Sequence, residues 1–178
     1  PRLDLKANPV HEQDGIVYFR THYYGGIKKY QWTCIPLALI GVVFTKDGKK
    51  VDINIGLKDS DPVFYVSDLL IHMAQDQMKK TLAEGITGEQ LQAVAGTHSE
   101  EGQAPKDAIM TLLKKEYGIE EEDFAAAELE LVPATKSRDV GFDRSLIASY
   151  GQDDRVCSYA NLEAILDAKP GVKTCLLY

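Results

Sequence analysis

Alternation of apolar and polar residues predicts several strands in the first part of the chain. Residues 15–24 are β-branched and aromatic and end at two glycines, which is typical of a strand followed by a turn. Residues 33–45 and 50–55 flank the segment KDGK at 46–49, where Asp-Gly favours the positive φ angles of a tight turn. These residues therefore predict a hairpin. Pro36 has no amide donor, so we expect its strand to lie at a sheet edge or to begin there.

Residues typical of helix ends predict two helices in the middle of the chain. The first covers about 68–83, with Ser67 as its N-cap and Gly85 at its end. The second begins at Pro105, which suits a first helical turn, and ends before Gly118. The second helix carries its apolar residues Ile109, Leu112, Leu113 and Tyr117 on one side.

A third helix and further strands complete the predicted elements. Residues 155–167 form an amphipathic helix, residues 1–6 and 128–134 alternate like strands, and residues 172–178 predict a buried strand. Strands and helices follow one another irregularly. The fold class is therefore α/β with a β-rich portion that contains hairpins and two or three helices.

Composition and charge narrow the class of protein. The chain has 178 residues, of which 44% are hydrophobic and 26% are charged, as in a soluble globular protein. The net charge of −7 argues against a general affinity for nucleic acid or for an anionic membrane surface. There is no apolar run of membrane-spanning length and no signal-peptide pattern, so we expect a cytoplasmic protein.

The cysteines and histidines show no metal-binding motif of their own. Cys34, Cys157 and Cys175 lack metal-type spacing, and the last two fall in apolar segments, which predicts buried free thiols in a reducing cytosol. None of the histidines forms an HExxH motif. His72 lies in the first predicted helix between apolar neighbours. By itself, such a histidine is more often partly buried or on the surface than catalytic.

Two adjacent aspartates, Asp153 and Asp154, stand just before the third predicted helix and allow two interpretations. Acidic residues at this place usually cap a helix, because they accept hydrogen bonds from its first amides. Alternatively, a strand end could deliver a carboxylate to a metal centre. One carboxylate can bridge two divalent ions that lie about 3.5–4 Å apart. Such a site needs several further ligands, which the chain does not obviously supply.

Three blocks of the sequence resemble the M18 family of metallo-aminopeptidases. PRLDLK at 1–6 is similar to the continuation of the family's H-x-D-S-P motif, and HYYGGIKKYQW at 22–32 resembles its Tyr-Gly-Gly segment. GQDDRVCSY at 151–159 is similar to the block G-R-L-D-D-K-L-C-S, in which the first aspartate of the pair bridges two metal ions. Departures at Gln152 and in QWTCIPLAL suggest a divergent bacterial-type branch.

The resemblance implies how the chain is organised. Residues 1–29 and 139–178 would be two pieces of a zinc-peptidase-like α/β catalytic domain, and residues 30–138 an inserted lid or oligomerisation domain. In the family, a Glu-Glu pair with the general base follows the strand that matches 172–178, and a metal-binding His precedes Pro1. We therefore expect a segment of a longer protein that is incomplete and inactive alone. A non-catalytic lid or oligomerisation module is the alternative, and an unrelated binding domain is a third class.

The resemblance also implies a reaction and the residues that serve it. The parent enzyme would hydrolyse N-terminal residues from peptides with two divalent ions, with zinc as the expected metal. Asp153 would bridge the ions, whereas Asp154 and Arg155 would orient the loop and begin the helix. His72 matches a stretch whose histidine reaches a neighbouring subunit's active site, although Ile71 replaces the family's proline. Subunits of the family form dimers that assemble into dodecamers.

Overall fold

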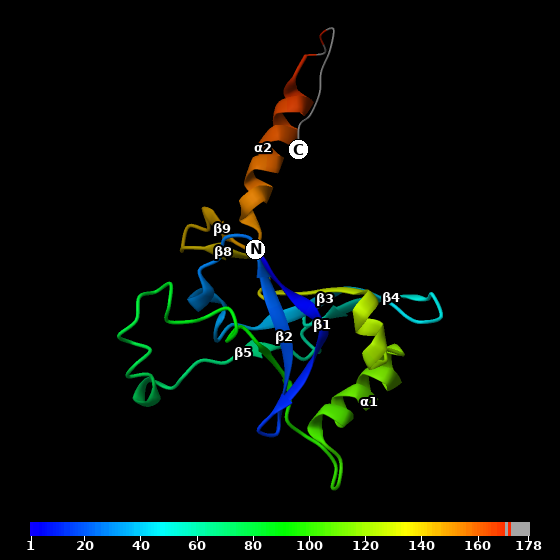
Figure 1. The fold of residues 1–178 in the computed structure, drawn as a ribbon. Coiled ribbons are helices and arrows are strands. Elements are labelled where there is room, and N and C mark those ends of the chain that lie inside the picture. The colour runs from blue at the N-terminus through cyan, green and yellow to red at the C-terminus, as the bar shows by residue number, and fades with distance from the viewer. Residues whose placement is uncertain (170, 172–178) are drawn as a thin grey trace. The chain divides into compact units, whose positions relative to one another are not determined.

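The computed structural model describes residues 1–169 and residue 171, and the chain forms two compact units (Figure 1). The first unit covers residues 1–134 and the second begins at residue 135. The boundary between them lies four residues before the predicted boundary at 138/139. Residues 1–29 contribute two strands to the sheet of the first unit, and their assignment to a catalytic domain stays a prediction.

The first unit is built on an antiparallel sheet of seven strands in the order β4-β3-β7-β1-β2-β6-β5. Strand β7 lies between β1 and β3, so it joins segments that are far apart in the sequence. The strands are β1 (Arg2–Gln13), β2 (Ile16–Tyr24), β3 (Leu37–Phe44), β4 (Lys50–Ile55), β5 (Tyr65–Val66), β6 (Ala93–Gly96) and β7 (Ala127–Pro133). The predicted strands at 1–6, 15–24 and 128–134 are therefore confirmed, within one residue where their ends were predicted, except that β1 runs on to Gln13.

The predicted β3–β4 hairpin is confirmed, although β3 begins at Leu37 and not at residue 33, and its turn shows why the sequence folds there. The amide of Gly48 donates a 2.7 Å hydrogen bond to the carbonyl oxygen of Thr45, and Gly48 has a φ of 77°. Glycine adopts this conformation without a steric penalty. Pro36 immediately precedes β3, so the strand begins there, as one of the two alternatives predicted. The strand is not at an edge, because β4 and β7 flank it.

Helix α1 (Pro105–Tyr117) confirms the second predicted helix. Pro105 occupies the first turn, and Gly118 ends the helix in the left-handed conformation with a φ of 71°. The helix contacts β1, β2 and β6, and its Leu113 is buried. The core of the unit lies around the sheet, with these residues among its most completely buried: Leu3, Val17, Leu37, Val43, Val66, Leu91, Ile119 and Leu131.

The predicted helix over 68–83 is wrong. The segment consists of turns and one short 3-10 helix, η2 (Ile71–Met73), and Ser67 caps no helix. Its apolar side chains Leu69, Leu70, Ile71 and Met73 are 50–72% exposed. An amphipathic helix is stabilised in proteins mainly by the packing of its apolar face. Without such packing, the end signals at Ser67 and Gly85 did not suffice to form a helix.

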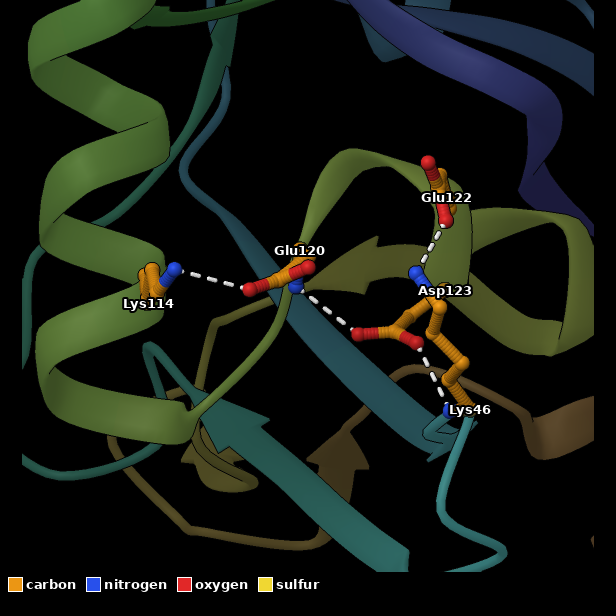
Figure 2. Close-up of polar contacts among 5 residues, drawn as sticks. All are labelled: Lys46, Lys114, Glu120, Glu122 and Asp123. Atoms are coloured by element: carbon orange, nitrogen blue, oxygen red, sulfur yellow. Dashed lines mark hydrogen bonds and ion pairs between the residues drawn. The ribbon is translucent and has the colours of Figure 1, made fainter.

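A buried carboxylate connects the β3–β4 turn to η3 (Glu121–Ala126), the 3-10 helix before β7 (Figure 2). Asp123 is 5% exposed and accepts hydrogen bonds from the amide of Lys46 at 2.9 Å and from the amide of Glu120 at 2.8 Å. Exposed ion pairs join Lys46 to Glu122 and Lys114 to Glu120. The ion pair and hydrogen bond to Lys114 hold the pKa of Glu120 below its ordinary value. Asp123 thus fixes the turn against the segment that leads into β7.

The second unit contains a hairpin of β8 (Arg138–Val140) and β9 (Leu146–Ala148), followed by α2 (Gln152–Asp167). The predicted helix over 155–167 lies within α2 and is confirmed. Its apolar residues are 45–69% exposed at Val156, Tyr159, Leu162 and Leu166. Cys157 is exposed too, so the prediction of a buried thiol is wrong there. The apolar pattern marks a face that can be buried, but no other described residue covers it.

The remaining predictions on the C-terminal residues concern positions that the structure does not describe. The strand over 172–178 and the buried thiol at Cys175 lie outside the described residues. No helix in the described part of the chain is long and apolar enough to cross a membrane. The fold is mixed α/β with a β-rich first unit, as the sequence predicts.

Candidate metal-binding site

The two aspartates lie where β9 gives way to α2. Gly151 is the N-cap of the helix and has left-handed backbone angles, with a φ of 78°. Asp153 has a φ of −90° and a ψ of 108°, which are not helical values, and the peptide bond between Asp153 and Asp154 is cis. Asp153 is therefore an extended residue inserted between the turn and the regular part of the helix.

The structure shows no side-chain capping hydrogen bond at Gly151, the residue before α2. Asp153 has the extended backbone that N-cap residues adopt and directly precedes the regular turns of the helix, so a capping role stays a prediction. The two carboxyl groups also interact with each other. A hydrogen bond to Asp153, the negative charge of Asp153 and partial desolvation all raise the pKa of Asp154 above its ordinary value. Two adjacent carboxyl groups at this exposed turn can attract a cation.

The long side chains beside Asp153 reach back to the turn that precedes it. Gln152 donates from Nε2 to the carbonyl oxygen of Ile147 at 3.1 Å, and Arg155 donates from Nη1 to that of Tyr150 at 2.7 Å. The sequence predicted an orienting role for Arg155 but not these contacts. No sequence pattern specifies which carbonyl group a flexible side chain will contact.

The described residues supply one candidate zinc ligand and do not complete a site. Zinc sites in proteins usually combine three or four side chains from His, Cys, Asp and Glu. Asp153 offers carboxylate oxygens of the required kind at an exposed position. Across residues 1–169 and 171, however, no group of three or more His, Cys, Asp and Glu side chains is placed to hold a metal ion.

His72 belongs to the first unit, whereas Asp153 belongs to the second. It lies in η2 with an exposed side chain, between the exposed residues Ile71 and Met73. Its imidazole forms no hydrogen bond with any other residue that the structure describes. A surface histidine of this kind is accessible to another molecule, and its chemistry depends on what approaches it.

Comparison with known proteins shows which family of proteins this chain resembles. The family model "Aminopeptidase I zinc metalloprotease (M18)" matches residues 1–176. The probable M18 family aminopeptidase 1 of Clostridium acetobutylicum is 51% identical over 180 residues, which is 99% of this chain and 39% of that protein. The corresponding protein of Thermotoga maritima is 50% identical over 173 residues, or 96% of this chain and 38% of that protein.

Solved structures agree with the sequence matches. The crystal structure of the M18-family aminopeptidase of Thermotoga maritima superposes with a TM-score of 0.88 at 49% identity, covering 95% of this chain and 38% of that one. Aminopeptidase I of Clostridium acetobutylicum gives a TM-score of 0.87 at 49% identity, covering 98% of this chain and 39% of that one. The chain thus spans less than half the length of these relatives. It belongs to the M18 family of aminopeptidase I zinc metalloproteases.

Proposed function

We propose that this chain is a segment of a metallo-aminopeptidase that removes N-terminal residues from peptides with two divalent metal ions. The observation that carries the proposal is the match to M18 aminopeptidases at about half identity over nearly the whole chain. Because the chain spans 38–39% of these relatives, the activity belongs to the parent protein. The segment is proposed to be inactive alone.

Asp153 is the residue of this chain proposed to hold the metal. Its two carboxylate oxygens suit a bridging ligand, and its extended backbone separates it from the regular turns of α2. Zinc bound there would polarise the scissile carbonyl and lower the pKa of a water molecule to about 7. Asp154 and Arg155 would stabilise the conformation of the turn and would not bind the metal.

The roles proposed for the parts of the chain follow from its resemblance to the family. Residues 1–29 and 139–178 would belong to the catalytic domain, and residues 30–138 would form the lid and the contacts between subunits. Self-association into dimers, and of dimers into a dodecamer, is part of this proposal, as is a cytoplasmic location. The alternative is a lid or oligomerisation module without catalysis. It is favoured by the lack of a ligand cluster among the described residues.

Removal of the metal tests the proposed reaction. We expect the full-length parent protein to release the N-terminal residue of a short peptide, to lose this activity after dialysis against a zinc chelator, and to regain it when zinc is added. The 178-residue chain alone should show neither stoichiometric zinc nor hydrolysis. Full activity of the metal-free parent would contradict the metal-dependent mechanism. Activity of the isolated chain would contradict its incompleteness.

His72 is proposed to act in the active site of a neighbouring subunit, where it would donate a hydrogen bond to the substrate carbonyl. We expect full-length His72→Ala and Asp153→Asn each to lose most of their activity. Co-expression of the two variants should restore about one quarter of the wild-type activity, because half of randomly formed dimers are mixed and each mixed dimer has one intact site. Mixed dimers without activity would contradict a role between subunits, and full activity of His72→Ala would contradict any catalytic role.

A further inference from the structure

The backbone that carries Asp153 is closed into a short loop by one side chain. Arg155 Nη1 donates to the carbonyl oxygen of Tyr150 at 2.7 Å, so this contact spans residues 150–155 and encloses Asp153. The contact from Gln152 to the carbonyl oxygen of Ile147 spans residues 147–152 and ends before Asp153. Of these two contacts between the start of α2 and the turn, only that of Arg155 restrains the backbone on both sides of Asp153.

Gly151 and Arg155 fit each other closely. A Cβ atom at Gly151 would lie 2.6 Å from Nη1 and 3.3 Å from Cζ of Arg155, so the guanidinium group occupies the space that a side chain would need. Gly151 also has a φ of 78°, in the left-handed region that favours glycine. Two features therefore determine where the planar guanidinium lies. The carbonyl group of Tyr150 accepts its hydrogen bond, and Gly151, which has no side chain, leaves the space that it occupies.

This restraint matters because the conformation of Asp153 is not the helical one. Its φ and ψ of −90° and 108° depart from those of the rest of α2, so the helix itself does not determine where its carboxylate points. A metal ligand must be held within a narrow range of orientations to bind with full affinity. The contacts around the residue therefore have to supply the orientation.

The geometry points to Arg155 as a positioning residue for the metal ligand Asp153, acting through its contacts with Tyr150 and Gly151. This inference rests on the proposed function, in which Asp153 binds zinc. Arg155 does not touch the metal in this role. The guanidinium is a cation, so its charge alone opposes the binding of zinc, and removing that charge would raise the affinity. If Arg155 positions Asp153, removing Arg155 should instead lower the affinity for zinc. The direction of the change in affinity therefore distinguishes the two effects.

Substitution of Arg155 in the full-length protein tests the inference. Arg155→Met should lower the affinity for zinc by a factor on the order of ten or more, as expected when a group that orients a ligand is lost. It should also change the absorption spectrum of the cobalt-substituted protein, which reports the coordination geometry. Arg155→Lys keeps a donor able to reach the carbonyl oxygen of Tyr150 and should restore most of the affinity. Affinity is measured by competition with a chromophoric chelator.

Gln152→Leu is the matched control, because it removes a side-chain contact to the same turn without opening the loop around Asp153. It should leave the zinc affinity within about twofold of wild type, since it removes no restraint on the ligand. If Arg155→Met does not fold, Arg155→Ala is used in its place, because it also removes the guanidinium. The same loss of affinity is expected.

The outcomes also separate this inference from the proposed function. Wild-type zinc affinity and an unchanged cobalt spectrum in Arg155→Met would overturn the positioning role if Asp153→Asn loses metal. An equal loss in Gln152→Leu and Arg155→Met would also overturn it, because the effect would then be a general loosening of the turn. Retention of two ions per subunit by Asp153→Asn would instead overturn the assignment of Asp153 as a ligand.

Discussion

Asp153→Asn in the full-length protein should abolish binding of the zinc pair and reduce turnover by at least about a thousandfold, because the metal ions carry most of the electrostatic stabilisation in such a reaction. The amide has nearly the shape of the carboxylate but lacks its charge and one of its two oxygen ligands. Asp153 is exposed in its unit, so in the metal-free 178-residue chain the change should alter the free energy of unfolding by less than about 0.5 kcal/mol. Zinc per subunit is measured by atomic emission and turnover with a peptide substrate.

A second acidic residue on α2 provides the control for this prediction. Glu163 is exposed on the same helix, and Glu163→Gln makes the same chemical change away from the turn. The control should keep two zinc ions per subunit and wild-type turnover. An Asp153→Asn protein that keeps both ions and normal turnover would show that Asp153 is not a ligand.

Gly41→Ala should destabilise the chain by roughly 3 kcal/mol or more, because a collision with fixed backbone adds to the strain of alanine at positive φ. Gly41 lies in β3 opposite Leu129 of β7 and has a φ of 136°. A Cβ there would collide with the carbonyl oxygen of Glu128. That oxygen is part of the sheet backbone and cannot move away without breaking the pairing of the two strands.

The matched control for Gly41 is a glycine that shares its positive φ but has free space around it. Gly48 has a φ of 77°, and nothing lies within 4 Å of a Cβ built there. Gly48→Ala should therefore cost only about 1 kcal/mol, the strain of the backbone conformation alone. Urea unfolding of the 178-residue chain, followed by circular dichroism, measures both free energies. Equal losses in the two variants would show that the close approach of β7 to Gly41 has no effect.

Two elements that the sequence predicts correctly have local signals at their turn or at their ends. The β3–β4 hairpin has alternating strands and a turn glycine, Gly48, and α1 is bounded by Pro105 and Gly118. These residues act on the backbone beside them, so their effect does not depend on the rest of the fold. The place of β7 between β1 and β3 has no such local signal and follows only from the tertiary structure.

The segment 68–83 shows that such signals can fail. Ser67 and Gly85 are typical of helix ends, but the structure leaves Leu69, Leu70 and Met73 exposed, and polar groups of the segment bond locally. Asp68 Oδ1 accepts hydrogen bonds from the amide of Leu69 and from Gln77. A periodic pattern indicates which face could be buried, but not whether another surface is present to bury it. The exposed thiol of Cys157 on α2 has the same explanation.

The candidate site was only partly accessible to sequence reasoning. The pair Asp153-Asp154 stands out because it follows a strand and a glycine, but local chemistry alone favours a capping role over a metal. Its assignment to a metal comes from the resemblance of one block to a family. The contact of Arg155 with Tyr150 uses the space left by the missing side chain of Gly151, and no sequence pattern specifies this arrangement.

The central place of β7 has a consequence for the order in which the chain can fold during synthesis. Strands β4 and β3 form one part of the sheet and β1, β2, β6 and β5 the other, and apart from the isolated bridge between Leu37 and Phe64, the described strands connect these parts only through β7. Until residues 127–133 leave the ribosome, β1 and β3 each present an open hydrogen-bonding edge. The unit is thus a fold of high contact order, whose two parts are joined by the last strand to be made.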